Sequence, residues 1–67
     1  MTMKNNDERF MSMIIYRLRM GGFGVESPAM HIHDAALEII EQEWIYRDDF
    51  ERASNLADQV MVAVLNP

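Results

Sequence analysis

Residues 20–28 read MGGFGVESP, and this stretch decides the fold because it separates two helical patterns. Gly21 and Gly22 follow the first pattern directly, where glycine can end a helix by adopting a left-handed backbone without a Cβ clash. Ser27 and Pro28 read as a helix start, a capping hydroxyl followed by a proline at the first helical position. The stretch therefore predicts a reversal between two helices. A phosphate-binding glycine loop would instead follow a strand.

Upstream of the glycines, residues 6–20 carry apolar side chains at helical spacing, and Asn5 or Asn6 can cap this first predicted helix. One apolar stripe consists of Phe10, Met11, Ile14, Ile15 and Leu18, and a second stripe on the opposite side consists of Met13, Tyr16 and Met20. We expect the first stripe to face the core and the second to contact another chain.

Downstream, residues 28–46 predict a second helix with a polar face formed by His31, Asp34, Glu38, Glu41 and Gln42. The remaining circumference is broadly apolar and includes Trp44, and His33 and Glu43 point into it. We expect His33 to be a satisfied core or interface residue. Glu43 can pair with Arg47 four residues later, or with an arginine of another subunit, Arg17 or Arg19.

Residues 49–65 predict a third helix, with Asp48 and Glu51 spaced as a capping box at its start. Its apolar stripe consists of Phe50, Ala53, Ala57, Val60, Met61 and Val64. The link around Arg47 is very short. It favours an antiparallel pair of helices, with one kinked continuous helix as the alternative.

These patterns predict an all-α fold, a compact three-helix unit that occupies residues 1–67 as a single domain, with residues 1–5 frayed. The 67 residues can bury only a modest core, and the chain has no cysteine for a disulfide. The apolar surface on the first two helices exceeds what one small core can cover. We therefore expect the unit to assemble as a homo-oligomer.

Charge is divided unevenly along the chain. Residues 1–25 have a net charge of +2 and residues 26–67 a net charge of −7, which gives −5 overall. An acidic surface repels nucleic acid, so we expect no direct binding to DNA and a protein partner with a basic surface. The short, interrupted apolar runs predict no membrane segment, and the lack of cysteine is compatible with the cytoplasm.

The HIHD motif at residues 31–34 raises the possibility of a metal site, because His31, Asp34, Glu38 and Glu41 follow one another at helical spacing. One helix can offer only two or three of these groups to a single ion, and no second ligand set is evident. No serine has a histidine at a suggestive spacing. We therefore expect neither a cofactor, nor a metal, nor catalysis.

The sequence favours a small acidic protein–protein interaction module that regulates or inhibits a larger protein. The target could be a nucleic-acid-processing protein, and the size and charge suit an inhibitor of the phage or mobile-element type. The predicted contact residues are Met13, Tyr16, Met20, Phe23, His33 and Trp44, with an acidic face of Asp34, Glu38 and Glu41. Two alternatives are a helix-turn-helix-like protein associated with nucleic acid and an oligomeric carrier of a small ligand or metal.

Overall fold

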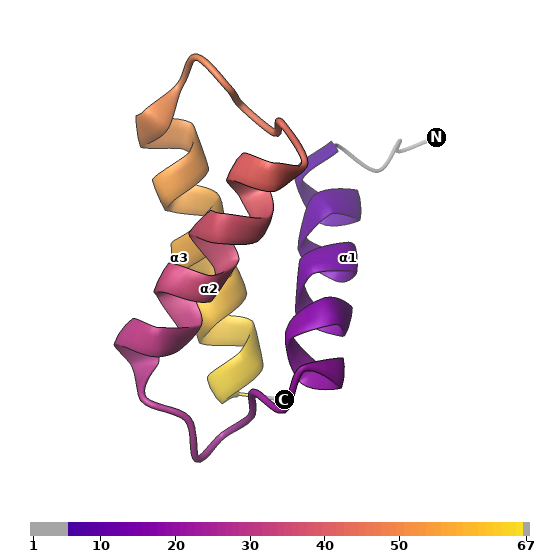
Figure 1. The fold of residues 1–67 in the computed structure, drawn as a ribbon, viewed down its shortest axis with the longest axis vertical. Helices are drawn as coiled ribbons and strands as arrows, with labels where there is room; N and C mark the ends of the chain where they lie inside the picture. The colour runs from indigo at the N-terminus through magenta and orange to yellow at the C-terminus, as the bar shows by residue number, and fades with distance from the viewer. Residues whose placement is uncertain (1–5, 67) are drawn as a thin grey trace.

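The computed structural model describes residues 6–66, which form three α-helices and no strand within that range (Figure 1). Helix α1 spans Asn6–Met20, α2 spans Ala29–Gln42 and α3 spans Phe50–Leu65. In Figure 1, α2 runs antiparallel to both other helices, and its most extensive contact is with α3. The predicted all-α three-helix fold is confirmed. The expected cap at Asn5 and the expected fraying of residues 1–5 lie outside the described residues.

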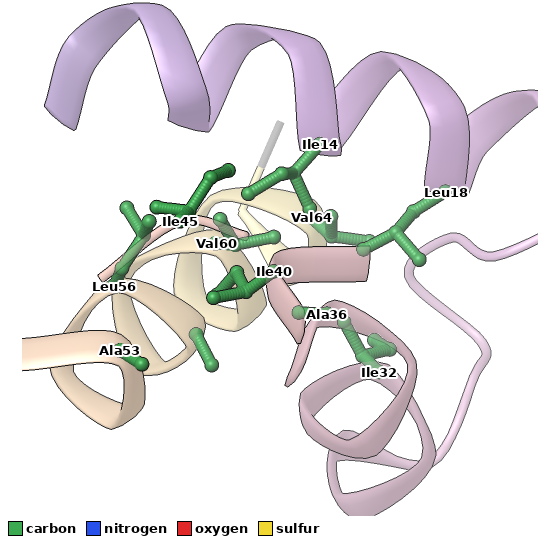
Figure 2. Close-up of a cluster of buried hydrophobic side chains, with 11 residues drawn as sticks. Ile14, Leu18, Ile32, Ala36, Ile40, Ile45, Ala53, Leu56, Val60 and Val64 are labelled. Atoms are coloured by element: carbon green, nitrogen blue, oxygen red, sulfur yellow. The ribbon is translucent and has the colours of Figure 1, made fainter. Parts of the chain in front are cut away.

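The core lies between the three helices and consists of aliphatic and alanine side chains (Figure 2). Helix α1 contributes only Ile14 and Leu18 as buried side chains, and both point from α1 toward α2 and α3 in Figure 2. The other buried residues are Ile32, Ala36, Ile40, Ile45, Ala53, Leu56, Ala57, Val60 and Val64. Every fully buried residue in the described part of the chain is apolar, so hydrophobic burial is the main force that holds α1 to the α2–α3 pair.

The reversal after α1 is a Schellman motif, as the two glycines predict. The Phe23 N–H donates to the Leu18 carbonyl at 3.0 Å, and the Gly22 N–H donates to the Arg19 carbonyl at 3.1 Å. Gly22 has a φ of 99°, a backbone conformation that residues with a Cβ rarely adopt. Phe23 then packs against the core from the loop, so this end of the bundle is closed.

We predict that Gly22→Ala lowers the free energy of unfolding by about 1–2 kcal/mol, because alanine resists the left-handed backbone. Gly24→Ala is the matched control, since a Cβ at Gly24 meets nothing within 4 Å and its φ lies outside the left-handed range. That variant should change stability by no more than about 0.5 kcal/mol. Urea denaturation followed by circular dichroism measures both, and equal losses would contradict the assignment of Gly22 as the helix terminator.

Helix α2 begins differently from the prediction. Pro28 is the N-cap, with φ −60° and ψ 134°, and the helix starts at Ala29. The Ser27 hydroxyl does not cap the helix. It accepts a hydrogen bond from the Gly24 N–H at 3.0 Å, while the Ser27 N–H donates to the Gly24 carbonyl at 3.0 Å. Ser27 therefore closes the turn that brings the chain back toward α2, and the predicted helix cap is wrong.

Helix α3 begins one residue later than predicted. Asp49 is the N-cap, and its side chain accepts a hydrogen bond from the Arg52 N–H at 3.0 Å. The expected capping box of Asp48 with Glu51 is therefore wrong. Residues 43–49 lie outside both helices, which makes α2 and α3 separate helices and excludes the single kinked helix.

Candidate protein-interaction site at the α2–α3 corner

Helix α2 ends at Gln42, four residues before the predicted end, in a second Schellman motif. The Trp44 N–H donates to the Glu41 carbonyl at 3.2 Å, and the Ile45 N–H donates to the Ile40 carbonyl at 3.0 Å. Trp44 occupies the position that is usually glycine, with a φ of 61°. We call residues 44–50, together with the pocket that they help to line, the α2–α3 corner.

Burial of Ile45 explains why the helix stops where it does. Nine residues separate Ala36 from Ile45, which is about half a turn around a helix at roughly 100° per residue. A continued helix would therefore place Ile45 on the side opposite the buried Ala36. The Schellman turn returns Ile45 to the core, where only 6% of its surface is exposed (Figure 2). Burying this side chain stabilises the fold by roughly 1.5–3 kcal/mol.

The corner contains backbone conformations that bulky residues rarely adopt. Trp44 and Tyr46 both have positive φ, at 61° and 50°. A left-handed backbone is unfavourable by roughly 1–2 kcal/mol for a residue with a Cβ, and glycine would avoid that penalty. Strain of this kind persists where the surrounding structure enforces it, and it often marks a functional segment.

Tyr46 is held by aromatic and cationic neighbours. Its ring meets Phe10 of α1 edge-on, with 5.8 Å between ring centroids, and the Arg52 guanidinium lies 4.4 Å from the ring centroid. The Tyr46 hydroxyl is buried without a hydrogen-bond partner among the described residues, as is Asp7 Oδ1 on α1. An unpaired buried polar atom is unfavourable by roughly 1–3 kcal/mol. The corner is thus fixed in place, although it is not optimised for stability.

A pocket of about 450 Å³ opens at the corner. It is lined by Leu37, Ile40, Glu41, Trp44, Ile45, Tyr46, Arg47, Phe50 and Ala53. Trp44 and Phe50 border it and remain 63% and 76% exposed. Phe50 was predicted to lie in the apolar stripe of the third helix, and its exposure shows that this prediction is wrong. At the first residue of α3, it lies beyond the buried part of the stripe, which begins at Ala53.

The charged groups around the pocket are mostly acidic. Glu41 lines it, and Asp48 and Glu51 are exposed on the adjoining segment. The two local cations are positioned over aromatic rings, with Arg47 4.2 Å from the Trp44 ring centroid and Arg52 over Tyr46. Such cation–π contacts hold each guanidinium over an aromatic surface. The corner therefore combines an apolar pocket with exposed carboxylates.

The predicted contact residues of α1 and the following loop divide into two groups. Tyr16 and Met20 are exposed, at 64% and 71%. Met13 and Phe23 are partly buried and pack against the core. Met13 therefore does not form a continuous outer stripe with Tyr16 and Met20.

His33 and Glu43 make contacts within the chain. His33 Nε2 lies 2.8 Å from Asp58 Oδ1, so the imidazole is partnered across the α2–α3 interface. Glu43 Oε2 lies 3.0 Å from Arg17 Nη1, in an exposed ion pair between α1 and the end of α2. The pairing with Arg17 was expected between subunits, and here it lies inside one chain. The alternative partner, Arg47, instead lies over Trp44 because the helix ends before it.

The acidic face predicted on α2 is present, since Asp34, Glu38 and Glu41 are all exposed. Glu38 Oε1 accepts a 3.4 Å hydrogen bond from the Gln42 side chain. Across residues 6–66, histidine and carboxylate groups do not gather in threes as a metal ion would require. None of the helices in that range is long and apolar enough to cross a membrane.

No protein-family model matches the sequence, and neither a curated protein nor a solved structure matches the chain. The candidate site is therefore assigned from the geometry of the residues alone.

Sequence reasoning identified Trp44 as a contact residue but not the corner to which it belongs. The chain carries no glycine, proline or asparagine at residues 43–47, so no local signal ends the helix there. One signal was available in the position of Ile45, which falls on the polar side of a continued helix. Three consecutive bulky apolar residues at 44–46 cannot all be buried on one helix face.

Proposed function

We propose that this protein acts by binding another protein, and that the α2–α3 corner is its contact surface. The observation that carries the proposal is Trp44, a bulky residue with a left-handed backbone whose exposed ring borders an apolar pocket. Glycine would be more favourable for folding at this position. A tryptophan kept there despite the strain is better explained by recognition than by stability.

The chemistry of the corner suits a protein segment with a large apolar side chain and neighbouring lysines or arginines. A pocket of about 450 Å³ can hold such an anchor. Tryptophan, tyrosine and arginine dominate the binding energy of most interfaces, and the corner contains Trp44, Tyr46 and Arg47. Exposed carboxylates at Asp48 and Glu51 favour a basic partner over an acidic one.

A chain of this size can regulate a larger protein by occupying one of its surfaces. We propose a regulator or inhibitor that acts only by covering a surface of its target. The acidic charge of residues 26–67 supports a basic target surface, which is common on proteins that process nucleic acids.

Selection of a random peptide library against the full chain tests the proposal. We expect the enriched peptides to carry an aromatic or large aliphatic residue next to lysine or arginine. Trp44 is the only tryptophan in the chain, so its fluorescence reports directly on occupancy of the corner. Binding should shift its emission to shorter wavelength as the ring leaves water.

Two serine substitutions test whether peptides bind at the corner or at any exposed aromatic side chain. Phe50→Ser should weaken peptide binding by roughly tenfold or more, the effect of removing an interface anchor. Tyr16→Ser removes a comparably exposed ring from α1 and should leave peptide binding unchanged. Enrichment of acidic peptides, equal losses in the two variants, or no enrichment at all would each contradict the proposal.

A further inference from the structure

Helix α1 presents an exposed row of residues on the side opposite the core. The row consists of Arg9, Ser12, Tyr16 and Met20, which follow one another at steps of three, four and four residues. All four are exposed, while Ile14 and Leu18 on the other side of the helix are buried. Steps of three and four keep residues on one face of a helix, so these side chains form a continuous ridge.

Helix α2 presents a second exposed row. It consists of Met30, Asp34, Glu38 and Glu41, at steps of four, four and three residues. All four are exposed, and the buried side of this helix is formed by Ile32, Ala36 and Ile40. The two rows cannot meet within one chain, because each lies on the side of its helix that faces away from the shared core.

The two rows match each other when they are aligned in opposite directions. Read backward, the α2 row has the same steps of three, four and four as the α1 row. Arg9 then lies opposite Glu41, and Ser12 lies opposite Glu38. Tyr16 lies opposite Asp34, and Met20 lies opposite Met30.

Each of the four positions in this register is chemically complementary. The pairs are a guanidinium with a carboxylate, a serine hydroxyl with a carboxylate, a phenol with a carboxylate, and two methionines. A parallel alignment would place Arg9 against Met30 and Met20 against Glu41, which leaves both charges unpaired. The pattern therefore specifies both the direction and the register of the contact.

We propose that a second copy of this chain binds through this contact, with its α1 row packed antiparallel on the α2 row of the first copy. Both complementary surfaces are present on one sequence, and the division of net charge into +2 for residues 1–25 and −7 for residues 26–67 favours the same pairing. The contact joins two different surfaces. Copies joined in this way form a closed ring where the rotation between them closes, and an open filament where it does not.

The contact is independent of the α2–α3 corner except for Glu41, which belongs to the α2 row and also lines the corner pocket. One pair of short exposed rows buries less surface than a standard interface, so we expect assembly at micromolar concentrations or above. Exposed ion pairs are screened by salt, and assembly should weaken as the sodium chloride concentration rises.

Sedimentation equilibrium of the full chain at low salt, from low to high micromolar concentration, tests the proposal. The unmodified chain should be larger than a monomer at the upper end of that range. Arg9→Glu should raise the dissociation constant by roughly tenfold or more, because it replaces an attraction by a repulsion. Arg47→Glu is the matched control, since it makes the same charge change at the corner and should leave assembly unchanged.

Mixing two variants tests the register itself. Glu41→Arg should dissociate the assembly on its own, as Arg9→Glu does. An equimolar mixture of the two variants restores opposite charges at this position and should recover association. A chain that is monomeric throughout, a control variant that dissociates equally, or a mixture that fails to associate would each overturn the proposal. Circular dichroism of each variant shows whether its helices are retained.

Discussion

Replacing Ile14 with alanine should lower the free energy of unfolding by about 2–5 kcal/mol, the range for removing a large buried aliphatic side chain. Ile14 has no exposed surface, and Leu18 is the only other residue of α1 that is fully buried. A domain of this length is stable by roughly 3–10 kcal/mol in total. We therefore expect the variant to lose a large fraction of its stability, because the attachment of α1 to the α2–α3 pair is weakened.

Ile15→Ala provides the matched control for this effect. Ile15 is the adjacent residue and the same amino acid, but it is only partly buried and packs against the edge of the core. Its replacement should cost about 1 kcal/mol, the centre of the range for single substitutions. Urea denaturation followed by circular dichroism measures both variants. If Ile15→Ala were as harmful as Ile14→Ala, the assignment of the buried side of α1 would be wrong.

Trp44→Gly should produce two opposite effects. Peptide binding at the corner should fall by roughly 30-fold or more, the loss expected when an interface anchor worth about 2 kcal/mol is removed. The free energy of unfolding should meanwhile stay the same or rise by up to about 1 kcal/mol. Glycine adopts the left-handed backbone at φ 61° without strain, and the lost ring is mostly exposed.

Trp44→Ala separates the effect of losing the aromatic ring from the effect of relieving the backbone strain. Alanine also removes the ring but keeps the strain of a Cβ in a left-handed conformation. Both variants should lose peptide binding to the same extent, measured by fluorescence anisotropy of a labelled peptide. The alanine variant should be less stable than the glycine variant by about 1 kcal/mol. A glycine variant that is much less stable than the unmodified chain would show that Trp44 serves the fold, and that strain at this position does not indicate recognition.

Local sequence signals were sufficient to predict the bounds of α1 and the position of the reversal after it. The bounds of α1 follow from its amphipathic pattern, and Gly22 ends the helix by the mechanism that its residue type predicts. Four residues of the predicted α3 stripe are buried, namely Ala53, Ala57, Val60 and Val64, and Leu56 is buried beside them. These features depend on residues close together in sequence. Apolar spacing and backbone preference are therefore enough to predict them.

The candidate site could not be predicted as fully from the sequence, because its geometry depends on residues that are distant along the chain. The sequence predicts Trp44 on a continuing helix, and no glycine, proline or asparagine between residues 43 and 47 marks an earlier end. The exposure of Phe50 and the stacking of Arg52 on Tyr46 arise only once the chain has turned. The acidic row on α2 was predictable, because its exposure follows from helical spacing alone.

Residue spacing along the chain is enough to predict three helices, the position of the first reversal and the buried sides of α1 and α3. Helical periodicity also predicted the exposed acidic residues of α2, whereas the outer stripe predicted on α1 was wrong at Met13, which packs against the core. The tertiary structure decided where α2 ends. Ile45 reaches the core only if the chain leaves the helix at Trp44, and the free energy of burying it offsets strain at the left-handed tryptophan. The same turn places Trp44 and Phe50 beside one pocket, and so creates the surface on which the proposed function depends.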